Sequence, residues 1–151
     1  MISNEALLQL TVRSYEQPVR EKLLAEIKHI AESIAEAHHS PKKPEITYGE
    51  TPTPAGYHDP ALSGRMQGVF ERLLGKDKVW LGEPMMGGED FGRFPQHFGA
   101  PGLQVRVGGA RPGHDPAVGL HSSKWSVDPE PTVRAGTQAF ARACLELLGK
   151  R

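Results

Sequence analysis

Apolar and polar residues alternate near the start of the chain, between residues 7 and 15. This period of two predicts a half-buried strand. From residue 18 to about residue 37 the apolar residues recur at every third or fourth position, which predicts an amphipathic helix opened by Pro18. A second short strand is expected over residues 45–50. The expected apolar face of the helix comprises Val19, Leu23, Ile27, Ile30 and Ile34.

A proline-rich stretch over residues 51–56 separates this region from the rest and predicts a boundary. Beyond it, two Asp-Pro pairs predict helices over residues 59–75 and 128–149, each capped by its aspartate and stopped by a glycine. Short apolar runs at 79–81 and 103–107 predict buried strands. The expected buried faces are Leu62, Met66, Val69, Phe70 and Leu73 in the first helix, and Val133, Gly136, Phe140, Ala143 and Leu147 in the second.

Composition narrows the class of protein. The 151 residues carry 18 basic and 18 acidic side chains, and this zero net charge argues against a nucleic-acid-binding protein, which would have a basic face. The single cysteine, Cys144, excludes a disulfide within one chain. No apolar run reaches the length of a membrane span, and the first residues lack the features of a signal peptide. These features predict a cytoplasmic protein without a membrane or nucleic-acid partner.

The segment Gly87-Gly88-Glu89-Asp90 places two carboxylates directly after a glycine pair, at a predicted turn into a helix. Glycines let a backbone bend sharply and approach a ligand closely. A helix N-terminus stabilises the ionised form of nearby carboxylates. Glu89 and Asp90 are therefore candidate site-lining residues. The alternative is that they only cap the helix.

His121 lies between a glycine-containing loop and two serines, a setting that suits a metal ligand or a general base. The alternative is a surface histidine. His114 is expected in an exposed turn, and His29 and His97 on the surface. A catalytic zinc needs about three protein ligands, and bridged two-metal sites need more. His121 is the strongest candidate ligand and Glu89 and Asp90 are weaker ones, so the count of firm ligands falls short.

Four stretches together resemble the second half of a metallopeptidase-type family. This family includes hippurate hydrolases, N-acyl-amino-acid amidohydrolases, auxin-conjugate hydrolases and carboxypeptidases of the G type. The stretches are the strand at 5–14, the helix at 18–37, Met86-Gly87-Gly88-Glu89-Asp90-Phe91 and Leu120-His121-Ser122-Ser123. Their order and intervals agree with the family's, and they extend over nearly the whole chain.

The resemblance implies an α/β (α+β) fold. Residues 1–51 would be the second strand–helix–strand half of an antiparallel lid domain of the dimerisation type. Residues 57–151 would be the C-terminal part of a mixed-sheet catalytic α/β domain. It also implies a divalent-metal-dependent amidohydrolase that cleaves N-acyl amino acids. His121 would bind one of two zinc or manganese ions, Glu89 and Asp90 would line the site, and Arg13 could bind a substrate carboxylate.

The chain also departs from the family pattern. The family's other metal ligands and its catalytic glutamate belong to a region upstream of the lid that has no counterpart here, and Ser123 replaces the usual proline. We therefore expect the chain alone to bind metal weakly or not at all and to have little activity. The alternative is a non-catalytic assembly remnant that forms a homodimer through exposed sheet edges.

Overall fold

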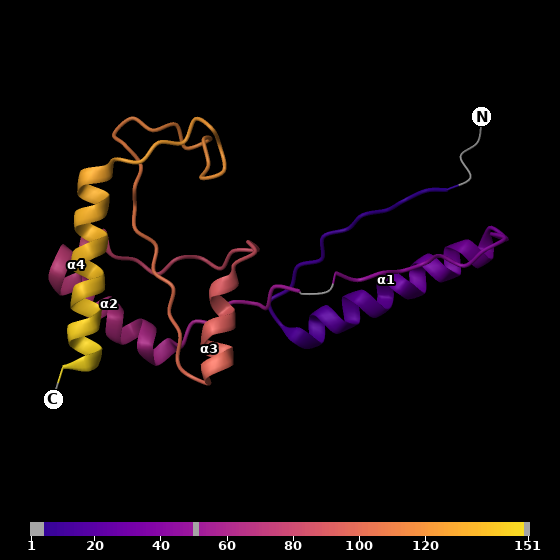
Figure 1. The fold of residues 1–151 in the computed structure, drawn as a ribbon, viewed down its shortest axis with the longest axis horizontal. Helices are drawn as coiled ribbons and strands as arrows, with labels where there is room; N and C mark the ends of the chain where they lie inside the picture. Colours follow the sequence, from indigo (N-terminus) through magenta and orange to yellow (C-terminus); the bar gives the residue numbers. More distant parts are fainter. Residues whose placement is uncertain (1–4, 50–51, 150–151) are drawn as a thin grey trace. The chain divides into compact units, whose positions relative to one another are not determined.

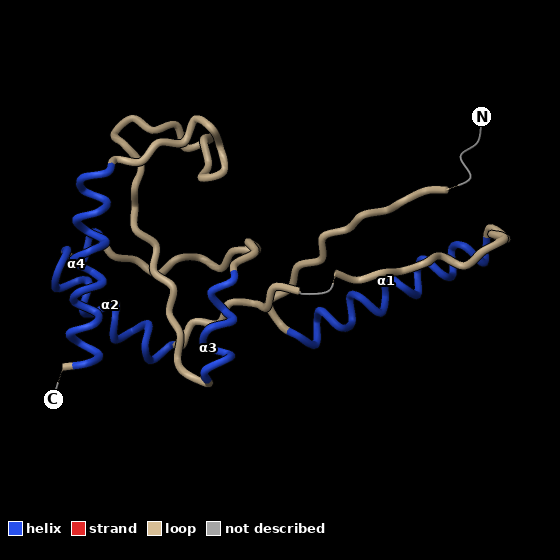
Figure 2. Tube along the Cα trace, in the orientation of Figure 1, coloured by secondary structure: helices blue, strands red, loops and turns tan. Residues whose placement is uncertain are grey.

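The computed structural model describes residues 5–49 and 52–149 (Figures 1 and 2). The chain divides into two compact units. Unit 1 takes the residues up to Tyr57 together with Pro84–Ala100. Unit 2 takes His58–Glu83 together with the residues from Pro101 onward. Unit 1 therefore contains two separate ranges of the chain, whereas the sequence predicted one continuous range for each domain. The predicted assignment of the two ranges to a lid domain and a catalytic domain remains a prediction.

Unit 2 is built on two helices, α2 (Pro60–Leu74) and α4 (Pro129–Leu148), with a short 3-10 turn, η1 (Lys76–Lys78), after α2. The Asp59 side chain caps α2 by accepting a 2.7 Å hydrogen bond from the Leu62 backbone N–H. Gly75 ends α2 with φ = 100°, a conformation that favours glycine. Both predicted helices of this unit are confirmed.

The core of unit 2 lies where α2 packs against α4. Its buried members are Met66, Val69, Phe70 and Ala139, and Leu62, Val79, Leu103 and Ala143 pack around them. Most of the predicted buried face of α2 is thus confirmed. At the edge of this contact, Arg65 Nε lies 2.9 Å from Glu146 Oε1, and Arg65 Nη2 donates to the Glu146 carbonyl at 2.7 Å.

The predicted buried face of α4 is wrong in part. Phe140 is 74% exposed and Val133 is 65% exposed, whereas Ala139 is buried and Gly136 lies against Val107. Small residues let the α4 backbone approach α2 closely, so they form the contact face in place of the large side chains.

Unit 1 contains the helix α1 (Gln17–Ala37), the 3-10 turn η2 (Asp90–Gly92) and the short helix α3 (Arg93–Phe98). The bounds of α1 agree with its sequence pattern, with Pro18 in the first turn. Its predicted apolar face does not enter a core, since Ile27 is only half-buried and the other four members are exposed: Val19, Leu23, Ile30 and Ile34. The segment that follows α1 returns alongside the helix at Leu24, where the Tyr48 hydroxyl donates to the Leu24 carbonyl at 3.5 Å.

The predicted α/β (α+β) mixed-sheet fold is wrong. The described residues form helices and loops without a strand, and their single isolated antiparallel bridge joins Ala110 and Val127 (Figure 2). A strand is stabilised by hydrogen bonds to a neighbouring strand, and alternation alone does not supply that neighbour. Leu8, in the first predicted strand, is accordingly 77% exposed, and Trp80, in the third, is 74% exposed.

The proline-rich segment predicted as a boundary, residues 51–56, is attached to α3 within unit 1. Arg93 Nη2 donates a 3.0 Å hydrogen bond to the Pro52 carbonyl. A Cβ atom on Gly92 would lie only 3.2 Å from the Ala55 oxygen, so glycine permits this close approach. The first residue of the predicted boundary, Thr51, and the last residue of the second predicted strand, Glu50, lie outside the described residues. In the described part of the chain, no helix is both long and apolar enough to cross a membrane.

Candidate functional site

The loop that carries Glu89 and Asp90 leads into η2. Glu89 occupies the cap position of η2, and its Oε1 accepts a 3.3 Å hydrogen bond from the Phe91 N–H. Asp90 begins η2, and its Oδ1 lies 3.7 Å from Arg93 Nε. The Asp90 side chain remains 80% exposed. Glu89 therefore acts locally as a cap, the alternative role considered for it, while Asp90 is accessible to a ligand.

Arg13 meets the same loop from a distant part of the sequence. Its Nη1 donates a 2.8 Å hydrogen bond to the Met86 carbonyl. A Cβ atom on Gly88 would lie 3.6 Å from the same nitrogen, so the guanidinium group lies against the glycine pair. The bond to Met86 uses one of the five N–H donors of an arginine, which leaves donors for an anionic ligand. Three of the predicted site residues, Arg13, Glu89 and Asp90, thus belong to one unit.

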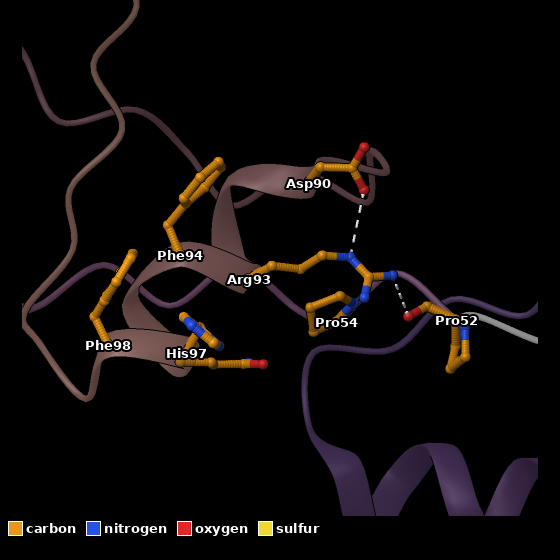
Figure 3. Close-up of a pocket in the computed structure, with 8 residues that line it drawn as sticks. Pro52, Pro54, Asp90, Arg93, Phe94, His97 and Phe98 are labelled. Carbon is orange, nitrogen blue, oxygen red and sulfur yellow. Dashed lines mark hydrogen bonds and ion pairs between the residues drawn. The ribbon is translucent and has the colours of Figure 1, made fainter.

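A pocket next to this loop opens beside η2 and α3 (Figure 3). Its volume is about 1000 Å³. The Phe94 and Phe98 rings form apolar walls, and Arg93 crosses toward the proline-rich segment, bonded to Pro52 and paired with Asp90 (Figure 3). The lining residues are Pro52, Pro54, Asp90, Arg93, Phe94, Gln96, His97 and Phe98.

Sequence reasoning did not single out this pocket, and it assigned His97 to the surface. The His97 ring packs edge-on against Phe98, with centroids 4.9 Å apart and an angle of 82° between the planes. A signal was present in the sequence. Phe91, Phe94 and Phe98 recur at helical spacing directly after the carboxylate pair, which places apolar side chains beside Asp90.

His121 lies in unit 2, on a series of tight turns. The Ser122 N–H donates to the Gly119 carbonyl at 3.0 Å, which closes a turn with His121 inside it. The Trp125 N–H donates to the Ser122 carbonyl at 3.0 Å and closes the next turn. The Ser122 hydroxyl accepts a 3.1 Å hydrogen bond from the Lys124 N–H. His121 is exposed on these turns, which fits both a loop ligand and the alternative of a surface histidine, so its role stays a prediction.

His114 anchors the loop that carries His121. Its Nε2 lies 3.0 Å from the Val118 carbonyl oxygen, and its ring packs edge-on against Trp125 at a centroid distance of 4.7 Å. The His114 N–H donates to the Arg111 carbonyl at 3.0 Å, so the expected turn is present, but the side chain is half-buried where an exposed one was expected. The partner residue Trp125, 11 positions later, could not be recognised from the local sequence around His114.

Candidate ligands for a metal ion do not gather at one place in the described residues. Among residues 5–49 and 52–149, no group of three or more His, Cys, Asp or Glu side chains is arranged to hold one. Glu89 is occupied by the Phe91 N–H, and Asp90 pairs with Arg93. The described part of the chain therefore does not fit a metal centre of its own.

Comparisons with known proteins extend over most of the chain. An uncharacterized hydrolase, y4tI, of Sinorhizobium fredii (strain NBRC 101917 / NGR234) is 24% identical over 98% of this chain and 35% of its own length. Thermostable carboxypeptidase 2 of Saccharolobus solfataricus (strain ATCC 35092 / DSM 1617 / JCM 11322 / P2) is 27% identical over 99% of this chain and 36% of its own length. YhaA of Bacillus subtilis (strain 168), named as a candidate amidohydrolase, is 34% identical over 64% of this chain and 24% of its own length.

No family model matches the chain, and no solved structure matches it. The chain spans about a third of the length of most of the curated relatives it matches. All three names describe hydrolases: one an amidohydrolase, one a carboxypeptidase and one a hydrolase without a stated substrate. These similarities support a relationship between this chain and hydrolases of the amidohydrolase and peptidase type.

Proposed function

We propose that this chain is part of a divalent-metal-dependent amidohydrolase that cleaves the amide bond of N-acyl amino acids of the hippurate type. The observation that carries the proposal is the similarity of nearly the whole chain to a carboxypeptidase and to another hydrolase. The placement of Arg13 beside the Glu89-Asp90 loop adds support, because a guanidinium group and an accessible carboxylate can bind a substrate with a free carboxylate and an amide N–H.

In such an enzyme the metal ions, zinc or manganese, would polarise the scissile carbonyl and activate a water molecule. His121 would be the ligand contributed by this chain, and the remaining ligands and the general base would belong to polypeptide that corresponds to the rest of the relatives' length. Because the described residues do not fit a metal centre, no catalytic step through a metal is assigned to this chain alone. We expect the purified chain to hydrolyse hippurate at most slowly.

A chimera tests the proposal directly. The matching third of thermostable carboxypeptidase 2 would be replaced by this chain, and hydrolysis of N-acyl amino acids would be measured with and without a chelator. We expect chelator-sensitive activity that His121→Ala reduces by a factor of roughly 100 or more, as for loss of a metal ligand. The matched control His29→Ala changes an exposed histidine of α1 and should retain the activity. A folded chimera in which both variants behave alike would contradict the role of His121.

A second candidate function is self-association, and it rests on the exposed segment before α1. Leu7, Leu8 and Leu10 are exposed there. Antiparallel pairing of residues 5–13 with a second copy, centred on Gln9, would place Glu5 opposite Arg13 of the other copy. Opposite charges in such cross-strand positions stabilise pairing. Light scattering would then find a dimer that Glu5→Arg disrupts and that Glu5→Arg with Arg13→Glu restores. A monomer at all concentrations would reject this candidate.

A further inference from the structure

Arg13 and Met86 are separated by 73 positions in the sequence, yet they share the 2.8 Å hydrogen bond from Arg13 Nη1 to the Met86 carbonyl. Both residues belong to unit 1. A guanidinium donor makes this a charge-assisted hydrogen bond, which is stronger than a bond between neutral groups. The contact is therefore able to restrain the loop even though it lies at the surface.

The loop needs such a restraint because of its sequence. Gly87 and Gly88 directly follow Met86, and glycine has more backbone freedom in the unfolded and open states than any other residue. On the other side of the glycine pair, the Glu89 carboxylate is fixed by the Phe91 N–H. The glycine pair is thus held between a bond at Met86 and a cap at Glu89.

We propose that Arg13 is a positioning residue that holds the backbone at Met86–Gly88 and thereby sets where Glu89 and Asp90 lie. The restraint itself is independent of the proposed hydrolase activity; only its consequence for hydrolysis rests on that proposal. Positioning by Arg13 is compatible with ligand binding. Its Nη1 donates to the Met86 carbonyl, and the guanidinium group has further N–H donors that do not take part in this bond.

Gly88 sets the limit on how closely the guanidinium group can approach. A Cβ atom at position 88 would lie 3.6 Å from Arg13 Nη1, which is an ordinary van der Waals contact. Alanine is therefore compatible with the contact, whereas a larger side chain at position 88 would meet the guanidinium group. We therefore expect Gly88→Leu to displace the guanidinium group from Met86 without changing Arg13, and Gly88→Ala is its matched control.

Backbone ¹⁵N order parameters of Gly87 in every variant, and of Gly88 where it is retained, test this role in the full 151-residue chain. We expect values near those of ordered backbone, about 0.8, in the unaltered chain and in Gly88→Ala. We expect values below about 0.6 in Arg13→Gln and in Gly88→Leu, with Arg13→Lys between the two groups because it retains a charged donor. Arg142→Gln, at an exposed arginine of α4 in unit 2, should leave both glycines unchanged.

Unchanged order parameters in Arg13→Gln would overturn the proposal, and so would glycines that are already disordered in the unaltered chain. If Arg13→Gln does not fold, as seen from loss of the amide resonances of α1, Gly88→Leu decides in its place, and retained order there would overturn the proposal. All of these measurements are made without substrate. A chimera without hydrolase activity would therefore contradict the proposed function and leave the role of Arg13 standing.

Discussion

Unit 1 and unit 2 are stabilised in different ways. In unit 2, Met66, Val69 and Phe70 of α2 are buried against Ala139 of α4. In the described part of unit 1, most of the large apolar side chains of α1 and of the segment before it are exposed. Unit 1 instead has hydrogen bonds between distant segments, such as Arg13 to Met86 and Arg93 to Pro52.

This difference separates two contributions to a site: apolar burial stabilises the fold, and hydrogen bonds orient the loops. Burial of apolar area gives most of the free energy of folding, but it is not directional. Hydrogen bonds contribute less free energy, yet they fix the direction of a loop. The carboxylate loop of unit 1 is therefore positioned by polar contacts with little core beneath it. The His121 loop of unit 2 belongs to the unit that has a core.

The largest expected effect comes from Met66, which is 2% exposed in the core of unit 2. Met66→Ala should lower the free energy of unfolding by about 2–5 kcal/mol, because it removes buried methylene groups and leaves a cavity. Leu8→Ala in unit 1, at a side chain that is 77% exposed, should change it by less than about 0.5 kcal/mol. Urea unfolding followed by far-ultraviolet circular dichroism measures both variants, since α1 lies in unit 1 and α2 and α4 lie in unit 2.

Equal destabilisation by Met66→Ala and Leu8→Ala would break the comparison. It would mean that the segment before α1 is buried in solution, against another part of the chain or against a second copy. Repeating the Leu8→Ala measurement at several protein concentrations separates these two cases, because association makes the apparent stability depend on concentration.

A smaller effect is expected at the helix caps, where two similar motifs differ. Asp59 accepts a 2.7 Å hydrogen bond from the Leu62 N–H, whereas within the described residues the Asp128 side chain makes no capping bond to α4. Asp59→Ala should therefore lower the free energy of unfolding of unit 2 by about 1 kcal/mol. Asp128→Ala should lower it by at most a few tenths of a kcal/mol. Urea unfolding measures both variants. A greater loss for Asp128→Ala would contradict the assignment of the caps.

The two caps illustrate how much of the fold could be predicted. Local signals placed the helices well: the Asp-Pro pairs mark the starts of α2 and α4, and Gly75 and Gly149 mark their ends. Whether a cap is made depends on side-chain direction, which the sequence pattern does not specify. The strands failed for a stronger reason, since strand pairing depends on a second segment at the right distance.

The candidate site was predictable to a similar degree. Residue types singled out Glu89, Asp90 and His121 as candidates, because carboxylates after glycines and a histidine beside a glycine-containing loop are local patterns, and their roles in a site stay predictions. The bond between Arg13 and Met86 was not predictable, since it joins segments 73 positions apart. The pairing of His114 with Trp125 is a medium-range contact that no local pattern indicates.

The smallest expected effect lies at His114, and it tests whether the loop that carries His121 is held locally. His114→Ala removes the contact of Nε2 with the Val118 carbonyl and the edge-on contact with Trp125. We expect a loss of about 0.5–1 kcal/mol and a shift of the Trp125 indole N–H resonance, together with greater mobility at His121. The matched variant His97→Ala removes a similar ring pair in unit 1 and should leave Trp125 unchanged. If His114→Ala left the Trp125 resonance and the backbone order at His121 as they were, the turns from Gly119 to Trp125 would suffice to hold this loop.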